Sequence, residues 1–160
     1  MTRVNLVPVG ELADQHLFAE FRELKMVPKS LARSLRALHR GEDANPASVW
    51  AHNRRVTKLL GRIPREYVLG AGHVSFFYDK GLFLQQRYSL IRHELRRRGV
   101  NFDENSLLDP DRVFERDARF RNDYTPTPAA LALIRARIAE RIAQKPEWYR
   151  WTAPTGLVPA

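Results

Sequence analysis

Residues 1–25 read MTRVNLVPVGELADQHLFAEFRELK, and this stretch sets the fold that we expect for the chain. Within residues 11–24, apolar side chains recur at spacings of four, four and three, which places them on one face of a helix: Ala13, Leu17, Phe21 and Leu24. The residues in front of this helix are not apolar enough for a signal peptide and too varied for a disordered tag. We therefore expect the first residues to fold back against the helix that follows them.

Four more segments have helical patterns. The sequence predicts helices at 30–39, at 49–60, in a long segment that ends at Arg98, and at 129–144. Pro28 is expected to end the first helix, because proline removes a backbone donor from a helix interior. Gly99 is expected to close the long helix, and Thr127 followed by Pro128 to start the last one.

The connections between these helices are long and polar. Residues 100–128 are expected to form a loop with one short helix, and residues 152–160 a loose tail. No internal repeat or interdomain linker is visible. The sequence therefore predicts a mainly α fold in which residues 1–160 form one compact domain, built from a few packed helices with long connecting loops.

The charge of the chain is strongly basic. Among its 160 residues, 27 are Lys or Arg and 18 are Asp or Glu, which gives a net charge of +9. A basic, arginine-rich domain attracts polyanions, and phosphate backbones are the commonest of these. Charge alone leaves two interpretations open, nucleic-acid binding or simple solubility.

Composition also excludes several classes of protein. The absence of cysteine excludes disulfides, thiolate catalysis and cysteine-ligated metals. No secretory signal and no run of 18 apolar residues is present, so we expect no membrane partner. We expect a cytoplasmic protein, associated with the nucleoid through DNA binding.

No familiar catalytic motif stands out. GAGH at residues 70–73 lacks the ending of a phosphate-binding loop and is interpreted as a turn or a close packing site. His93-Glu94 lacks the second histidine of a zinc hydrolase, and no histidine pair suggests a metal. RHELRRRG at residues 92–99 is interpreted as a solvated or phosphate-facing helix end. We expect neither a metal nor an organic cofactor.

The N-terminus itself offers a nucleophile. Thr2 is small, so removal of Met1 would leave a threonine with a free α-amine. Such an amine has an unperturbed pKa of about 7.7–8.0, against about 10.4 for lysine. Arg3 and Arg22 would disfavour its ammonium form, because like charges repel. A nucleophilic amine that attacks a sugar carbon can form a Schiff base.

The first helix also carries a polar strip opposite its apolar face. At about 100° per residue, this strip contains Leu12, Gln15, His16, Ala19, Arg22 and Glu23. A carboxylate, an arginine, a histidine and an amide therefore share one surface. An ordinary solvated helix face is the alternative interpretation of the same pattern.

Three blocks of the sequence carry a family resemblance: MTRVNLVPVGELADQHLFAEFREL (1–24), YVLGAGHVSFFYDK (67–80) and RIAQKPEWYR (141–150). In this order they resemble the phage endonuclease V family of pyrimidine dimer DNA glycosylases. The resemblance runs from Met1 to about Trp151, and the first block is the most specific. It implies a compact, mostly α, single-domain fold and a partner, double-stranded DNA that contains pyrimidine dimers.

The resemblance also implies roles for particular residues. In the family, the α-amine of the N-terminal threonine attacks the deoxyribose and a helix-borne glutamate assists elimination; these roles fall on Thr2 and Glu23. Residues implied to contact DNA or to line the same region are Arg3, Gln15, His16, Glu20, Arg22, Arg137 and Arg141. Trp148, Tyr149 and Arg150 correspond to the aromatic tail of the family. The activity implied is that of a DNA N-glycosylase with AP lyase activity.

The chain departs from the family pattern in two places. A proline-arginine pair is replaced by Lys25-Met26. Lys25 places a positive charge one position from that of the family arginine, but an ammonium group lacks the forked guanidinium that binds phosphate through two nitrogens. The basic stretch 33–65 is longer than in the phage enzyme and either extends the DNA footprint or decorates the surface. Two rival functions stay open: a non-enzymatic arginine-rich nucleic-acid-binding module, and a related lyase for abasic sites or another lesion.

Overall fold

The computed structural model describes residues 4–39 and 49–154, and within these ranges the regular elements are helices. The α-helices are α1 (Asp14–Glu23), α2 (Met26–His39), α3 (Val49–Leu60), α4 (Gly81–Arg97) and α5 (Pro128–Gln144). Short 3-10 helices lie at Val9–Glu11, Ser75–Phe77, Val113–Arg116, Ala118–Phe120 and Pro146–Trp148. The described residues form no strand, only an isolated bridge between Lys80 and Arg121. The predicted mainly α fold is confirmed.

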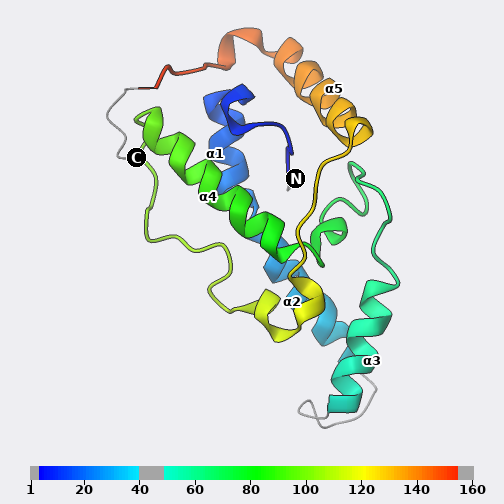
Figure 1. The fold of residues 1–160 in the computed structure, drawn as a ribbon. Coiled ribbons are helices and arrows are strands. Elements are labelled where there is room, and N and C mark those ends of the chain that lie inside the picture. Colours follow the sequence, from blue (N-terminus) through cyan, green and yellow to red (C-terminus); the bar gives the residue numbers. More distant parts are fainter. Residues whose placement is uncertain (1–3, 40–48, 155–160) are drawn as a thin grey trace.

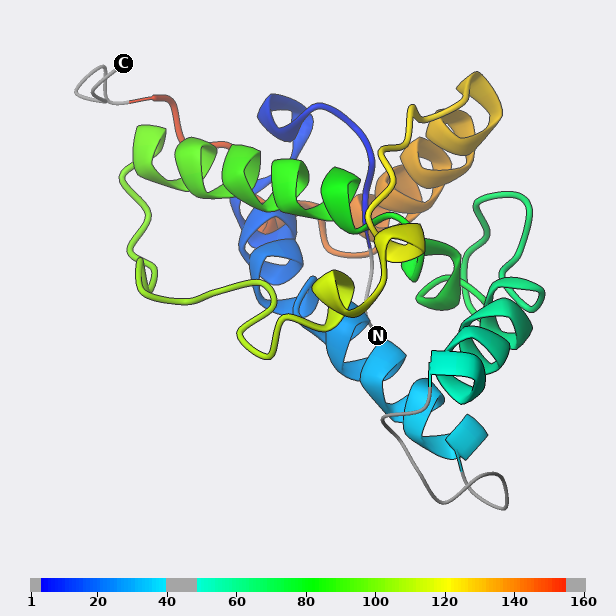
Figure 2. The ribbon, with the colours of Figure 1, turned by 60° about the horizontal axis from the view of Figure 1, so that its bottom comes forward.

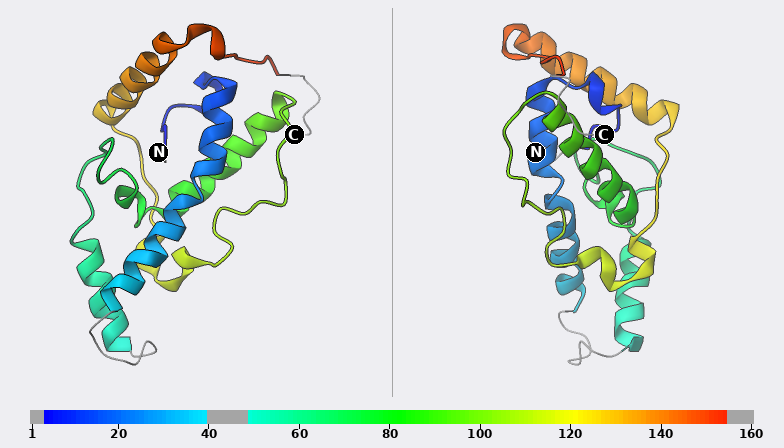
Figure 3. Two further views of the ribbon diagram at one scale, coloured as in Figure 1. Left: turned by 180° about the vertical axis from the view of Figure 1, so that it is seen from behind. Right: turned by 60° about the vertical axis from the view of Figure 1, so that its left-hand side comes forward.

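The helices are arranged around the packing of α1 against α4 (Figure 1). Seen from behind, α2 continues the run of α1, and α3 packs beside α2 (Figure 3). Helix α5 lies across the end of the molecule at which α1 begins (Figure 1). The segment 4–8 passes between α1 and α5 (Figure 2), so the described start of the chain is flanked by two helices.

The first helix is shorter than the sequence predicts. It begins at Asp14, because residues 9–11 form a separate 3-10 helix and Leu12 has an extended backbone. The helical wheel that placed Leu12 on the polar strip therefore does not apply to it, and Leu12 is fully buried. Pro28 does not end this helix but lies in the first turn of α2, where its missing N–H breaks no helical hydrogen bond.

The other helix ends follow the expected chemistry. The Thr127 hydroxyl accepts a hydrogen bond from the Ala130 N–H at 3.0 Å, and Pro128 opens α5. Gly99 follows α4 with a φ of +72°, as a closing glycine should. Gly70 and Gly72 have φ values of +77° and +88°, which confirms the turn predicted at GAGH.

The long loop and the tail are more ordered than expected. Between α4 and α5 the chain forms two short 3-10 helices where one short helix was expected. Thr152, the first residue of the expected loose tail, is hydrogen-bonded to Asp14. Residues 155–160 lie outside the described residues.

The interpretation of RHELRRRG as a solvated or phosphate-facing end is wrong for two of its residues. Glu94 and Arg98 are buried. The Arg98 guanidinium donates to the carbonyl oxygens of Leu12 at 2.7 Å and Val9 at 3.2 Å. Arg98 is buried because these carbonyls, exposed by the end of a 3-10 helix, need donors that water does not supply there.

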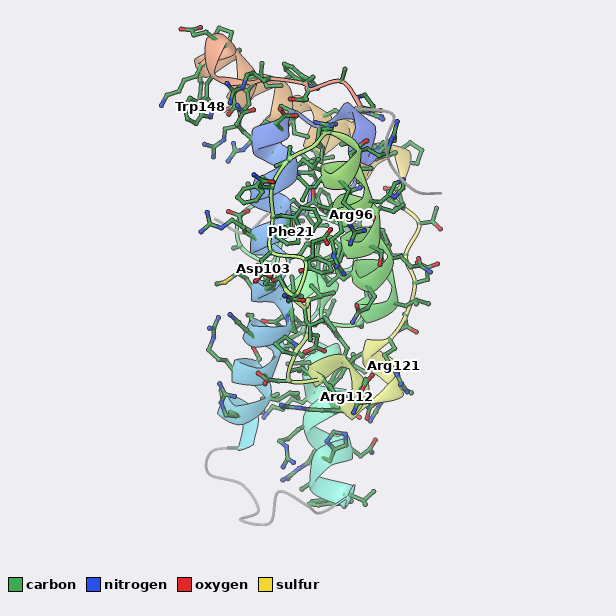
Figure 4. The ribbon with its side chains drawn as sticks, turned by 90° about the vertical axis from the view of Figure 1, so that its left-hand side faces the viewer. Phe21, Arg96, Asp103, Arg112, Arg121 and Trp148 are labelled. Atoms are coloured by element: carbon green, nitrogen blue, oxygen red, sulfur yellow. The ribbon has the colours of Figure 1, made fainter. Side chains whose placement is uncertain are left out.

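An aromatic cluster fixes α1 on α4. Phe21 of α1 stacks on Tyr88 of α4 with ring centroids 5.3 Å apart, and Phe102 meets Phe21 edge-on at 5.3 Å. The Arg96 guanidinium lies over the Phe102 ring at 5.6 Å. Figure 4 shows the segment that carries Asp103 crossing in front of Phe21, so the chain after α4 covers the contact between the two helices.

None of the described helices is long and apolar enough to cross a bilayer.

Gly81 should be intolerant of a side chain. A Cβ at Gly81 would lie 2.7 Å from Phe114 Cγ and 2.8 Å from the Phe120 carbonyl oxygen. Because one of these neighbours is backbone and the other a buried ring, we expect Gly81→Ala to lower the free energy of unfolding by about 1–3 kcal/mol. Urea denaturation measures this value from the shift of the midpoint at constant slope.

Gly10→Ala is the matched control, because a Cβ there meets no atom within 4 Å. We expect it to change the free energy of unfolding by no more than about 0.5 kcal/mol. Equal losses in the two variants would show that the contact of Gly81 with Phe114 is looser than described.

Candidate active site

A pocket opens between α1, α5 and the start of the described chain. Its volume is about 230 Å³. The lining residues are Asn5, His16, Ala19, Glu20, Glu23, Ile138, Arg141 and Tyr149. The pocket therefore combines one wall from α1, one from α5 with the segment after it, and an edge from the N-terminal segment.

The N-terminal segment is fixed by hydrogen bonds to its backbone. The Val4 N–H donates to His73 Nε2 at 2.8 Å, and the Tyr67 hydroxyl donates to the Val4 carbonyl at 2.7 Å. The Asn5 N–H donates to Glu20 Oε1 at 3.1 Å. Because these bonds use backbone groups, they fix the path of the chain whatever the side chains of the segment are.

His73 is held in one protonation form by its two neighbours. Its Nδ1 lies 2.8 Å from the Val68 carbonyl oxygen, which can only accept, so Nδ1 carries the proton. Nε2 then offers a lone pair to the Val4 N–H. The neutral ring is therefore the form that fits this arrangement, and it is 2 % exposed.

Glu20 and Arg87 form a buried ion pair beneath the pocket. Arg87 Nε and Nη2 donate to the two Glu20 oxygens at 2.7 and 3.1 Å. Arg87 Nη1 also donates to the Val7 carbonyl. A buried pair is costly to desolvate unless its remaining hydrogen-bonding capacity is used, and here the backbone of Asn5 and Val7 uses it.

The segment after α5 is attached to the start of α1. The Gln15 amide donates to the Trp148 carbonyl at 2.6 Å and accepts from the Arg150 N–H at 3.0 Å. The Asp14 N–H donates to the Arg150 carbonyl at 2.7 Å. Gln15 therefore holds the backbone on both sides of Tyr149. The Tyr149 ring packs against the His16 ring at a tilt, with ring centroids 4.6 Å apart.

The structure brings together part of the predicted set of site residues. Those that line the pocket are His16, Glu20, Glu23, Arg141 and Tyr149. The predicted residues within the described ranges that do not line it are Gln15, Arg22, Lys25, Arg137, Trp148 and Arg150. Thr2 and Arg3 lie outside the described residues.

The surrounding residues differ in what they contact. Arg22 is exposed and Trp148 is 62 % exposed, so both are accessible to a large ligand. Lys25 lies with its ammonium 5.1 Å from the centre of the Phe21 ring, against the aromatic cluster. Arg137 pairs with Glu140 at 3.7 Å on α5, one turn before Arg141. Their contacts with DNA remain predictions.

A comparison with protein families gives the matching description as pyrimidine dimer DNA glycosylase, over residues 1–108. The chain belongs to this family. It is therefore a DNA repair glycosylase that acts on pyrimidine dimers in DNA. The matched residues include α1, the His73 turn and α4, which together fix the N-terminal segment of the glycosylase.

Three residues that build this site were not singled out from the sequence. His73, Tyr67 and Arg87 all bond to the backbone of residues 4–7. The available signal for Arg87 was its place on the apolar side of α4. An arginine at such a position is expected to be buried, and arginine is rarely buried without partners. For His73 and Tyr67 no local signal exists, because their partners lie more than sixty positions away.

The site offers no ligand set for a metal in the part of the chain that the structure describes. No group of three or more His, Cys, Asp or Glu side chains comes close enough there to hold an ion. Glu20 is paired with the buried Arg87, so the remaining carboxylate and guanidinium of the lining are those of Glu23 and Arg141.

His73→Phe should release the N-terminal segment. The substitution keeps the ring but leaves the Val4 N–H and the Val68 carbonyl without partners, at about 1–3 kcal/mol for each buried group. We expect lower stability in urea and loss of hydrogen-exchange protection at the Val4 amide. His93→Phe, at an exposed position of α4, is the control and should change neither. Retained protection at Val4 in His73→Phe would contradict the anchoring role.

Attachment of the tail should weaken in acid. Burial by itself raises the pKa of Asp14, but hydrogen bonds from Thr152 and Arg98 outweigh it and hold this pKa below the ordinary 3.8. A carboxyl whose pKa is lower in the folded state stabilises the fold above pH 4, and this contribution is lost as the pH falls through the folded-state value. We expect tryptophan fluorescence to report an acid transition that is smaller in Asp14→Asn. Identical transitions in both proteins would contradict this role for Asp14.

Proposed function

We propose that the glycosylase uses the α-amine of Thr2 as its nucleophile and the carboxylate of Glu23 as its general base, and that it cleaves the strand after removing the base. The observation that supports this most is the fixed path of residues 4–7 along the pocket that Glu23 lines. A chain start held by backbone hydrogen bonds beside a carboxylate is what such a mechanism needs.

Chain length limits how far the nucleophile can be from this pocket. One residue, Arg3, lies between Thr2 and Val4, so the two Cα–Cα steps from Val4 to Thr2 span at most about 7 Å. An α-amine is a suitable nucleophile near neutral pH, because its unperturbed pKa is about 7.7–8.0. A lysine would be almost fully protonated under the same conditions.

The proposed reaction begins when the amine nitrogen attacks C1′ of the deoxyribose. The glycosidic bond breaks and its electron pair leaves with the base. A proton then passes from nitrogen to the ring oxygen O4′ as the C1′–O4′ bond breaks, which gives an iminium that joins protein to sugar. Glu23 stabilises this cation and removes a proton from C2′. The electrons form a C2′–C3′ double bond and expel the 3′ phosphate. Water then hydrolyses the imine and releases the enzyme.

The surroundings of the pocket suit a DNA substrate. Arg141 lines it and Arg22 is exposed beside it, so cations are available for phosphates next to the reacting sugar. The sugar is not accessible in an intact stack, so a nucleotide must be moved out, at a few kcal/mol and least at a distorted step. A pyrimidine dimer distorts the duplex and so lowers this cost.

Glu23→Gln tests the base. The amide keeps the shape of the side chain but can neither take a proton nor balance the iminium charge. We expect single-turnover cleavage of a dimer-containing duplex to fall by about 10²–10⁴. Affinity for the same duplex, measured by gel shift, should stay equal or rise, because a negative charge is removed.

Glu147→Gln is the matched control, because it removes the same charge from an exposed position next to Trp148 without lining the pocket. We expect its cleavage rate to stay within about twofold of the wild-type rate. If Glu23→Gln cleaves within tenfold of the wild type, Glu23 is a surface carboxylate and another group is the base. If base release persists while the strand stays intact, the lyase step is not part of the activity.

A further inference from the structure

A second and larger pocket lies between α2 and α3, outside the candidate active site. Its volume is about 520 Å³. Its wall contains two cations, three hydroxyls and an apolar floor, contributed mainly by Ser34, Lys58, Leu59, Arg62, Ser75 and Tyr78. The glycosylase chemistry described above uses none of these residues.

The cations of this pocket are available for an anion. Lys58 and Arg62 are both exposed, one helical turn apart, and neither forms an ion pair with any residue that the structure describes. This distinguishes them from the arginines that pair with acidic neighbours, such as Arg112 with Glu115 and Arg119 with Asp117. Two adjacent unpaired cations at the wall of a pocket favour a phosphate group.

The hydroxyls can supply a donor as well. Tyr78 Oη is within hydrogen-bond distance of Ser30 Oγ at 2.5 Å and of Ser34 Oγ at 3.2 Å. Three hydroxyls joined by two hydrogen bonds use two of their three protons, so one proton is left to donate. Ser34 and Tyr78 line the pocket, so when the remaining proton is on either of them it is a neutral donor beside the two cations.

The pocket is aligned with the candidate active site. Ser34 follows Glu23 by eleven residues, close to three helical turns, and Figure 3 shows α1 and α2 running one after the other. Ser75, on the opposite wall, is two residues from His73, which anchors Val4. The α1–α2 run therefore contributes to both pockets, and the segment that carries His73 and Ser75 connects the α2–α3 pocket to the anchored N-terminal segment.

Their separation corresponds to a short length of duplex. Glu23 ends α1, and Ser34 and Leu38 lie in α2; counted at about 1.5 Å per residue along this run, the separation of eleven to fifteen residues is about 17–22 Å. Phosphates along one strand are about 3.4 Å apart along the duplex axis. The distance from one pocket to the other is thus about five or six base pairs.

We propose that the α2–α3 pocket binds a backbone phosphate of the duplex that flanks the lesion, about five or six base pairs from it. Lys58 and Arg62 neutralise the phosphate, and the hydroxyl group of Ser34 or Tyr78 donates to it. The contact carries no sequence information and fixes the register of the enzyme on DNA. This inference rests on duplex DNA as the substrate and not on the chemistry assigned to Thr2 and Glu23.

The test compares the Lys58→Ala/Arg62→Ala double variant with wild type on duplexes that carry one pyrimidine dimer. One duplex has flanks of about twelve base pairs on both sides, and two others have one flank or the other shortened to about three. Wild type should bind one of the shortened duplexes on the order of tenfold more weakly. The double variant should bind the long duplex on the order of tenfold more weakly than wild type does. Shortening the flank that matters for wild type should not weaken the binding of the double variant further.

Two further measurements separate this contact from other effects. Because one phosphate contact is lost, the slope of log affinity against log salt should flatten by about one in the double variant on the long duplex. Single-turnover cleavage at saturating enzyme should be unchanged, because the pocket does not touch the reacting sugar. The affinities and the salt slope report binding alone, so these two results stand even if Thr2 or Glu23 has another role.

Arg116→Ala/Arg121→Ala is the matched control, because it removes the same net charge from exposed side chains. Figure 4 shows Arg121 on the side of the molecule away from α2. We expect this control to keep the wild-type dependence on flank length. Equal losses in both double variants would reduce the effect to overall charge and overturn the proposal. A different result would assign the pocket to a small ligand instead: wild type binds a free mononucleotide, Lys58→Ala/Arg62→Ala abolishes this binding, and flank length has no effect on DNA affinity.

Discussion

The ion pair between Glu20 and Arg87 is the interaction on which the site depends. Their side chains are 0 % and 5 % exposed, so the pair must satisfy all its hydrogen-bonding capacity within the protein. The Asn5 N–H and the Val7 carbonyl complete it. The N-terminal segment therefore gives each member of the pair one further hydrogen bond, and displacing the segment would remove both, at about 1–3 kcal/mol for each buried group left unsatisfied.

This constraint gives two glutamates of one helix different roles. Both line the pocket, but Glu20 is buried and bonded to Arg87 of α4 and to the Asn5 N–H, whereas Glu23, three residues later, is partly exposed. His73 and Tyr67 extend the anchoring to Val4. The described chain is thus anchored from residue 4 onward, and in the proposed mechanism this anchoring would lower the entropic cost of placing a reactive amine near a sugar.

The sequence predicts the local features of this fold well and its long-range contacts poorly. The α4 end at Gly99, the α5 start at Thr127 and the turn at GAGH depend on residues within one turn of each other, and all three are confirmed. Leu12 and Arg98 were placed on the surface because a helical wheel and a charge run are local patterns. Their burial results from a 3-10 helix whose carbonyls need Arg98 as a donor. Likewise, nothing near Gln15 in the sequence indicates that its amide holds the backbone around Tyr149.

The central claim is that the anchored N-terminal segment delivers an amine to the sugar. Borohydride reduction during reaction with a dimer-containing duplex, followed by digestion and mass spectrometry of the adduct, tests it most directly. The account predicts a reduced protein–DNA link on the N-terminal peptide, at the Thr2 nitrogen, and no link when that amine is acetylated. A link on a lysine, or undiminished trapping by the acetylated protein, would contradict it.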